Sequence, residues 1–302
     1  MKVSVVIPSL DQAAFLEQAI LSVLDQRGID FEVIVIDGGS SDGSQEIIER
    51  HAHRLAYWVS EPDSGQSEAI NKGWAQASGD VLCWLNADDY YLPGALATAG
   101  GYLSSAPEVG VVYGDCFVVD RDGAVTGRQA PRPFDLVDFV MRCNDYIPSG
   151  STFLRASVAA TVGTLGEDLH YLMDQDYWLR CGLVTTIRAI PDTLSCFRVY
   201  PEAKTWSGGG ARAAELARVF EAFAARDDLP AALARQRGRI RAHAHAGAVG
   251  HYLHAGDVSA GWREVVLSVR NAPLCCLRTW LRIARNALRR VTVGTAAGRS
   301  RS

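Results

Sequence analysis

Strand-like and helix-like segments alternate along the first third of this 302-residue chain, and this alternation constrains the fold more than any other feature. Short apolar runs typical of buried strands occur at residues 3–8, 31–37, 57–60, 80–86 and 109–113. Segments with amphipathic helical spacing lie between them, at residues 13–26, 46–51, 67–77 and 92–104. This order predicts parallel strands with right-handed crossovers, in an α/β sheet flanked by helices.

The rhythm changes after residue 113. Residues 116–120 and 124–128 flank an Arg-Asp-Gly sequence, which predicts a hairpin and hence a mixed region after the parallel strands. Beyond Trp206 the chain is rich in Ala and Arg with helical periodicity and almost no strand signal. We therefore expect an α/β domain over residues 1–205 and a helical extension over residues 206–302.

Charge separates the same two regions. Residues 231–302 hold thirteen Arg, no Lys and two acids, a formal charge of +11, and the rest of the chain carries −15. Within residues 277–290, arginines at 278, 282, 285 and 289 form one helical stripe, with leucines on another face. Such a helix is compatible with an anionic membrane surface, and equally with packing on the α/β domain. Nucleic acid is excluded as a partner because the core is acidic and lacks an aromatic stacking platform.

Cellular location can also be addressed from the sequence. Seven cysteines without a Cys-x-x-Cys pair indicate reduced thiols, and the first residues lack the long apolar stretch of a signal peptide. No run of about 18 apolar residues occurs, so no membrane-spanning helix is expected. The sequence favours a cytoplasmic protein, with peripheral attachment at the inner face of the plasma membrane left open.

Acidic residues gather where the predicted strands end. The loops at 8–11, 37–40, 61–65 and 86–89 all follow strands, and three of them contain carboxylates beside small residues. Ligands of open α/β sheets bind at this edge, and an acidic rim there implies a divalent cation if the ligand carries phosphate. Asn86, Asp88 and Asp89 offer hard oxygen ligands suited to Mg²⁺ or Mn²⁺. The alternative is that the two aspartates cap the helix expected from Leu92.

Four motifs together resemble the inverting glycosyltransferases of family two, which have the GT-A fold. They are VVIPSLDQ with AILSVLDQ, then VIVIDGGSSDGS, and finally SEAINKGWAQASGDVLCWLNADD, which is similar to the donor-site helix and DXD-type strand end. The resemblance covers residues 1–205. It implies transfer of one sugar from an NDP-sugar, with a UDP-sugar favoured, to a hydroxyl of a glycan or lipid-linked acceptor.

The resemblance also implies a donor site. Asp37 is expected to bind the nucleotide base, with Pro8 and Ser9 forming the opposite wall. Lys72 is expected to pair with Asp37 or with the diphosphate. Asn86 and Ala87 complete the donor contacts, and Asp88 is the expected metal ligand, with Asn86 as a second candidate.

Two departures from the family pattern concern this donor site. Gly38 stands where an acid often follows Asp37, and Asn86 replaces the first Asp of the metal motif. Asn86 keeps an oxygen ligand but removes a negative charge, so weaker metal affinity is expected.

The catalytic base is expected at the start of a later helix. Asp174 falls on the base position of the family, and Asp176 is the alternative. Residues 147–152 resemble the acceptor-side loop. Arg198 and Lys204 resemble a segment that faces the diphosphate, either as a lid or as a plain surface loop. Many relatives carry His where this chain has Tyr200; if that His is a metal ligand there, that ligand is absent here.

Two other patterns, a Gly-rich sequence and a group of histidines, are weaker signals of a binding site. The Gly-rich sequence from Gly208 follows no strand, which disfavours a dinucleotide site. Histidines 243, 245, 251 and 254 lack an obvious metal partner and read as surface or packing residues. A sugar nucleotidyltransferase and a non-catalytic sugar-nucleotide or glycan-binding protein are the competing functions. The first lacks a basic triphosphate loop, and the acids at 88 and 174 argue against the second.

Overall fold

The computed structural model of the protein describes residues 1–143, 146–204 and 208–273. Two compact units can be distinguished, Met1–Leu136 with Asp145–Ala203, and Val137–Asn144 with Lys204–Ser302. The sequence-based boundary after residue 205 stays a prediction, and it does not anticipate that Val137–Asn144 groups with the C-terminal helices. Residues 277–290, the predicted membrane contact, lie outside the described residues.

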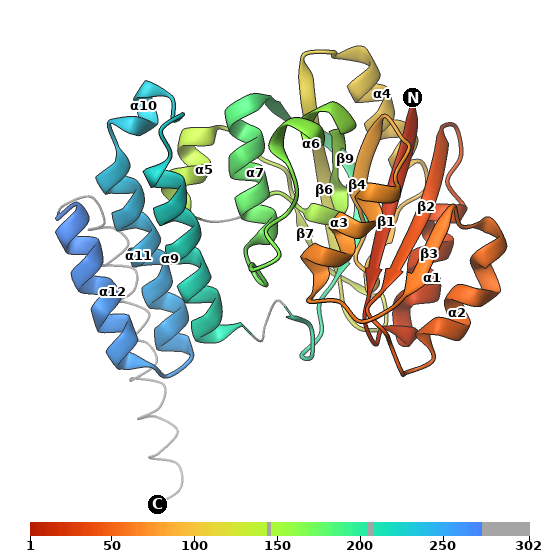
Figure 1. The fold of residues 1–302 in the computed structure, drawn as a ribbon, viewed down its shortest axis with the longest axis horizontal. Helices are drawn as coiled ribbons and strands as arrows, with labels where there is room; N and C mark the ends of the chain where they lie inside the picture. Colours follow the sequence, from red (N-terminus) through yellow and green to blue (C-terminus); the bar gives the residue numbers. More distant parts are fainter. Residues whose placement is uncertain (144–145, 205–207, 274–302) are drawn as a thin grey trace, which may run out of the picture. The chain divides into compact units, whose positions relative to one another are not determined.

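The first unit is organised around one sheet, shown in Figure 1. Its strands run in the spatial order β3-β2-β1-β4-β8-β6-β9-β5, with β7 paired to β6. Their bounds are β1 Lys2–Ser9, β2 Asp30–Asp37, β3 Tyr57–Ser60, β4 Val81–Trp84, β5 Tyr90–Tyr91, β6 Val109–Val119, β7 Val125–Gln129, β8 Thr152–Arg155 and β9 Thr186–Arg198.

The predicted α/β fold flanked by helices is confirmed, but its sheet is mixed rather than mostly parallel. Strand β1 lies between β2 and β4 and is parallel to both, and β2 is parallel to β3. The sheet then becomes mixed, because β8 enters antiparallel between β4 and β6, while β9 runs parallel to β6. The predicted hairpin is present as β6–β7, but its first arm is the continuation of the strand expected at 109–113.

Helices connect these strands and cover the sheet. In the first unit they are α1 Ala13–Leu24, α2 Ser44–His51, α3 Gln66–Gln76, α4 Ala95–Ser105, α6 Ala156–Val162 and α7 Met173–Val184, with α5 Leu136–Arg142 at the division between the units. Helix α4 begins at Ala95 with Gly94 as its N-cap and no side-chain capping bond. The alternative in which Asp88 and Asp89 cap a helix at Leu92 is therefore wrong.

The alternation of side chains along each strand gives the sheet two apolar faces. Val3, Val5 and Ile7 of β1 belong to a buried cluster with residues of α1, α2 and α4. Val6 points to the other face, where α3 approaches so closely that a Cβ at Gly73 would lie 2.4 Å from a Val6 methyl group. Only glycine at this helix position permits that approach.

An aromatic cluster fills the same face under the end of β4. The rings of Trp84 on β4 and Trp178 on α7 stack with centroids 5.4 Å apart and an interplanar angle of 7°. Trp74 of α3 packs against Trp84 and also against Tyr177. Strand β4 and helix α7 are thus joined by flat, buried rings.

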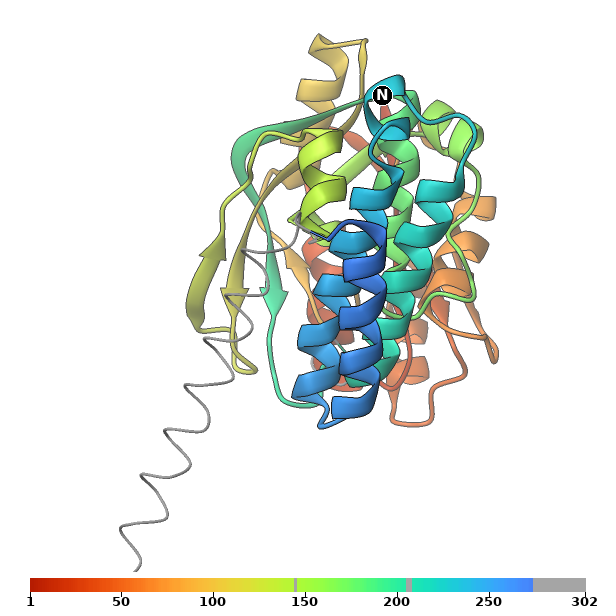
Figure 2. The same ribbon diagram turned by 90° about the vertical axis from the view of Figure 1, so that its left-hand side faces the viewer.

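The second unit contains α9 Gly209–Ala225, α10 Ala231–Ala234, α11 Arg237–His254 and α12 Val258–Asn271. Helix α11 packs against both α9 and α12, as Figure 2 shows. Buried His245 of α11 lies between two acids, with Nδ1 2.7 Å from Glu264 and Nε2 3.0 Å from Glu221. This histidine therefore joins the three long helices. Among the described residues, no helix is long and apolar enough to cross a membrane.

Glu32 fastens the amino-terminal ends of the central strands. Its carboxylate on β2 accepts hydrogen bonds from Lys2 Nζ and Ser4 Oγ on β1 at 2.6 Å each, and from Ser78 just before β4. Burial raises the pKa of Glu32, but these hydrogen bonds outweigh it and lower the pKa from 4.5 to about 2.

We expect Glu32→Gln to destabilise the protein in a pH-dependent manner. A depressed carboxylate pKa contributes stability above the unfolded pKa and loses it as the pH falls through the folded value, so the wild-type advantage is largest near neutrality, up to about 3 kcal/mol. Chemical unfolding from about pH 7 down to about pH 3 measures this difference, which should shrink with acidification. Exposed Glu49→Gln is the matched control. Equal stability of wild type and Glu32→Gln at neutral pH contradicts the assignment.

Candidate functional site

The candidate site lies at the carboxyl ends of β1, β2 and β4. Ser9 at the end of β1 pairs with Asp37 at the end of β2, and Asp37 pairs with Ser60 of β3. Leu85, just past β4, donates its N–H to the Val6 carbonyl of β1. The parallel register thus brings the loops that begin at Leu10, Gly38, Glu61 and Asn86 to one edge, as the sequence predicts.

Asp37 is fully buried and already engaged. Its Oδ2 accepts the Ser40 N–H at 2.9 Å and the Ser60 hydroxyl at 2.6 Å, and its Oδ1 accepts the Ser40 hydroxyl at 2.5 Å. These bonds shape the Gly-Gly-Ser turn after β2. The predicted contact of Asp37 with a base stays a prediction, since this carboxylate has an evident part in holding the loop.

The two wall residues of β1 are also buried. Pro8 is buried near the end of β1, and Ser9 is 5% exposed. Within the described part of the chain, the Ser9 hydroxyl has no hydrogen-bond partner. An unpaired buried hydroxyl is costly, so Ser9 offers a donor and acceptor to a ligand at this edge.

Asp63 lies beside the loop that follows Asp37, and the sequence did not single it out. A Cβ built at Gly38 would lie 3.0 Å from Asp63 Oδ2, so the Asp63 carboxylate occupies the space that a side chain at 38 would fill. Burial raises the pKa of Asp63. An acid from the β3–α3 loop thus lies beside Gly38, the position at which the family resemblance leads one to expect an acid. The acidic loop at 61–65 was the only sequence signal for this.

Lys72 does not pair with Asp37. On α3 its Nζ lies 2.8 Å from Glu61 and 2.9 Å from Glu68. These hydrogen bonds raise the pKa of Lys72, so the amine stays charged. The lysine balances the acids beside the loop, and a diphosphate would have to compete with two carboxylates for it.

The loop after β4 is held by a chain of hydrogen bonds. Gln66 Nε2 donates to Asn86 Oδ1 at 2.7 Å, and Asn86 Nδ2 donates to Asp89 Oδ2 at 3.1 Å. Asp89 is 3% exposed and also accepts the Arg198 N–H at 2.9 Å. Burial and the neighbouring Asp88 charge raise the pKa of Asp89 well above its usual range. Asp89 and Asn86 therefore shape the loop, and buried Ala87 lies between Asn86 and Asp88.

Asp88 presents a carboxylate with a single side-chain partner among the described residues. Its Oδ2 accepts the Tyr200 hydroxyl at 2.9 Å, and that hydroxyl also lies 3.4 Å from Gln12 Oε1. Burial raises the pKa of Asp88, partly offset by the Tyr200 hydrogen bond. Tyr200 thus contacts the expected metal ligand through its hydroxyl.

Arg198 differs from the predicted diphosphate lid. It is 3% exposed, and its guanidinium donates to the Asp88 carbonyl at 2.9 Å and to Gln18 Oε1 at 2.7 Å. Further bonds reach the carbonyls of Asp120 and Arg121. With its donors directed at protein acceptors, Arg198 is a positioning residue for the acidic loop. Lys204, the other predicted lid residue, is exposed and belongs to the second unit.

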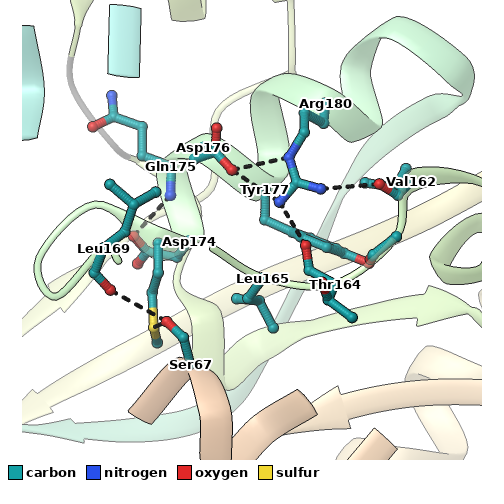
Figure 3. A network of polar contacts seen from close by, with 12 residues as sticks. Ser67, Val162, Thr164, Leu165, Leu169, Asp174, Gln175, Asp176, Tyr177 and Arg180 are labelled. Atoms are coloured by element: carbon teal, nitrogen blue, oxygen red, sulfur yellow. Dashed lines mark hydrogen bonds and ion pairs between the residues drawn. The ribbon is translucent and has the colours of Figure 1, made fainter. Parts of the chain in front are cut away.

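The two candidate bases on α7 have different surroundings, shown in Figure 3. Asp176 lies 2.8 Å from Arg180, whose guanidinium also binds the carbonyls of Val162 and Thr164. Asp174 instead accepts the Ser149 hydroxyl at 3.1 Å and the Gln175 N–H at 2.8 Å. This arrangement favours Asp174 as the base, because Asp176 is committed to an ion pair.

A single turn of 3₁₀ helix, Ser149–Ser151, connects the candidate base with the acidic loop. Ser149 binds Asp174, and a Cβ at the next residue, Gly150, would lie 3.8 Å from Asp89 Oδ2. Asp174 therefore lies beside Ser149, and Asp89 lies beside the next residue, Gly150. The sequence predicted each group separately, and the fold brings them to the same turn.

The residues present fit a divalent cation that is bound by few protein ligands and whose coordination shell is completed by a substrate. Among the described residues no group of three or more His, Cys, Asp or Glu is arranged to hold a metal. Mg²⁺ and related ions commonly take one or two carboxylates and complete their shell with phosphate oxygens and water. Asp88 suits that arrangement, while the Asn86 oxygen is turned to Gln66.

Comparison with solved structures supports the fold. The chain resembles S. aureus TarS 1–349 in complex with UDP-GlcNAc, with a TM-score of 0.66, 16% identity, and coverage of 88% of this chain and 90% of that one. It also resembles the mannosyltransferase PcManGT from Pyrobaculum calidifontis in complex with GDP-Man and Mn²⁺, with a TM-score of 0.59, 21% identity, and coverage of 93% and 83%. At these identities the likeness establishes the GT-A fold alone.

Sequence comparison identifies the family. An uncharacterized glycosyltransferase of Mycobacterium tuberculosis is 35% identical over 193 residues, 62% of this chain and 72% of that protein. A PGL/p-HBAD biosynthesis glycosyltransferase of Mycobacterium bovis is 30% identical over 182 residues, 59% and 68% of the two chains. The model of glycosyl transferase family 2 matches residues 4–161. Since this match spans more than half of the sequence, the chain is a glycosyltransferase that belongs to family 2.

Proposed function

We propose that this enzyme transfers one sugar from a UDP-sugar to a hydroxyl of a glycan or lipid-linked acceptor, with inversion at the anomeric carbon and with a divalent cation. The observation that carries the proposal is the placement of Asp174 and the Asp88–Asp89 loop around the turn at Ser149 and Gly150. A base and a diphosphate-binding loop at one edge of the sheet are what direct displacement requires.

The donor follows from the strand ends. The unpaired Ser9 hydroxyl and the Asp63 carboxylate offer a donor and an acceptor to a nucleotide base beside the β1 and β2 loops. TarS binds UDP-GlcNAc and PcManGT binds GDP-Man with Mn²⁺, which supports a nucleotide-sugar donor for this related fold.

The chemistry uses few groups. Asp174 accepts the proton of the acceptor hydroxyl as its oxygen attacks the anomeric carbon, and the bond from that carbon to the diphosphate breaks on the opposite side. The nucleoside diphosphate leaves with the electron pair. Asp88 would hold a divalent cation, which when bound would supply Lewis acidity to the departing diphosphate. Ser149 orients Asp174, and Arg198 fixes the backbone of the acidic loop.

Asp88→Ala is expected to lower turnover by at least about 10²-fold, because a metal ligand supplies several kcal/mol of charge stabilisation in the transition state. Release of NDP from a panel of NDP-sugars with added Mn²⁺ measures the effect. Asp122→Ala, at an exposed turn, is the control and should retain wild-type activity. Normal activity of Asp88→Ala removes the metal assignment.

Asp174→Asn is expected to keep donor binding and to lower the transfer rate by about 10²–10⁴-fold, the usual contribution of a general base. Transfer to an acceptor and NDP-sugar affinity are measured on the same preparation. Asp176→Asn, which loses the Arg180 ion pair, serves for comparison and should mainly affect stability. If Asp176→Asn loses more activity at equal stability, the base is Asp176.

Tyr200→Phe is expected to weaken Mn²⁺ affinity by about 10–100-fold, because hydrogen bonds to a ligating carboxylate orient it for the metal. The signal of free Mn²⁺ in electron paramagnetic resonance gives the dissociation constant without an activity assay. Tyr57→Phe, at an exposed position on β3, is the matched control. An unchanged dissociation constant for Tyr200→Phe would show that this hydroxyl does not position Asp88.

A further inference from the structure

Helix α12 carries an exposed apolar stripe in the second unit. Val258, Trp262, Val266 and Val269 are 54%, 65%, 47% and 42% exposed. Their spacing of four, four and three residues places them on one side of the helix. Isolated exposed apolar residues are ordinary, but a contiguous row that includes a tryptophan marks an interaction surface.

The opposite side of α12 is occupied by its packing on α11. Ser268 is buried and donates its hydroxyl to the Ala242 carbonyl at 2.8 Å. Glu264 turns inward to His245, and small Ala260 and Gly261 are buried. The apolar stripe is therefore separate from the packing face of α12, because the opposite side of the helix is the one that is buried against α11.

The exposed charges along the stripe are basic, apart from Asp257 at the N-cap, whose carboxylate accepts the Ala260 N–H and the Ser259 hydroxyl. Arg263 and Arg270, seven residues apart, are exposed beside it, and the residues of α12 that are exposed between 258 and 270 include no acid. In sequence, residues 274–302 follow with seven Arg and no Asp, Glu or Lys. The stripe thus lies in a strongly basic part of the chain.

We propose that the exposed face of α12 docks on an anionic lipid bilayer. Trp and Val would enter the boundary between headgroups and acyl chains, while Arg263 and Arg270 contact lipid phosphates. Charge favours this occupant over the chain's own segment 274–302, which has seven Arg and no acid, and over a second copy that presents the same α12 face, because both would bring arginines against Arg263 and Arg270. The proposal is independent of the glycosyl transfer proposed above.

Vesicle sedimentation of the full chain tests the site. Wild type is expected to bind vesicles of phosphatidylglycerol with phosphatidylcholine about tenfold more tightly than vesicles of phosphatidylcholine alone. Trp262→Glu should lower binding to the anionic vesicles at least about tenfold. Its carboxylate would have to enter the apolar boundary of the bilayer, and it would also be repelled by the negatively charged headgroups. Val125→Glu is the matched control, since Val125 on β7 is 61% exposed and remote in sequence. Release of NDP should be unchanged in Trp262→Glu, which separates this test from the glycosyltransferase proposal.

Fluorescence locates the contact. Brominated lipid should quench emission that Trp262 contributes, measured as the difference between wild type and Trp262→Phe. Without vesicles, acrylamide should quench the same contribution strongly at every protein concentration. Shielding at all concentrations would mean that the chain covers its own stripe, and shielding that grows with concentration would mean self-association. Either result, or equal vesicle binding by Trp262→Glu and wild type, overturns the proposal.

Discussion

A buried guanidinium holds the acidic loop of this enzyme in place. Arg198 is the last residue of β9, and its donors reach the Asp88 carbonyl, the Gln18 side chain and the carbonyls at the β6–β7 turn. Removing such a cation from water is expensive, and each acceptor repays part of that cost. Three separate stretches of chain are thereby fixed to the end of β9. Its backbone N–H also binds Asp89, so the loop is held from both its backbone and its side chain.

Much of the fold could be predicted because it depends on patterns of residues that lie close together in the sequence. The apolar runs and helical spacings between residues 3 and 113 fix the parallel strands, and parallel strands collect their carboxyl ends at one edge. The acidic character of that edge was therefore visible in the sequence. The antiparallel entry of β8 between β4 and β6 was not, because its pairing depends on contacts far apart in the chain.

The candidate site divides in the same way. Asp88 and Asp174 were identifiable from motifs, whereas the contact between Asp88 and Tyr200 joins residues 112 positions apart and has no local signal. Arg198 was expected to face phosphate from its motif position alone. A motif position does not show whether a side chain is buried, so the burial of Arg198 could not be predicted. Asp63 was overlooked because its relation to Gly38 is a matter of filled space, which a linear reading does not contain.

The stacked rings of Trp84 and Trp178 fix the distance between the end of β4 and the start of α7. Trp84 stands four residues before Asp88, and Trp178 stands four residues after Asp174, so each ring lies about one turn or a short step from a group of the candidate site. Parallel indoles resist sliding, since any displacement opens a void in a closely packed interior. Surface loops could then change in sequence while the separation between Asp174 and Asp88 stays the same. The aromatic pair would thus set the spacing of the two aspartates independently of the loops around them.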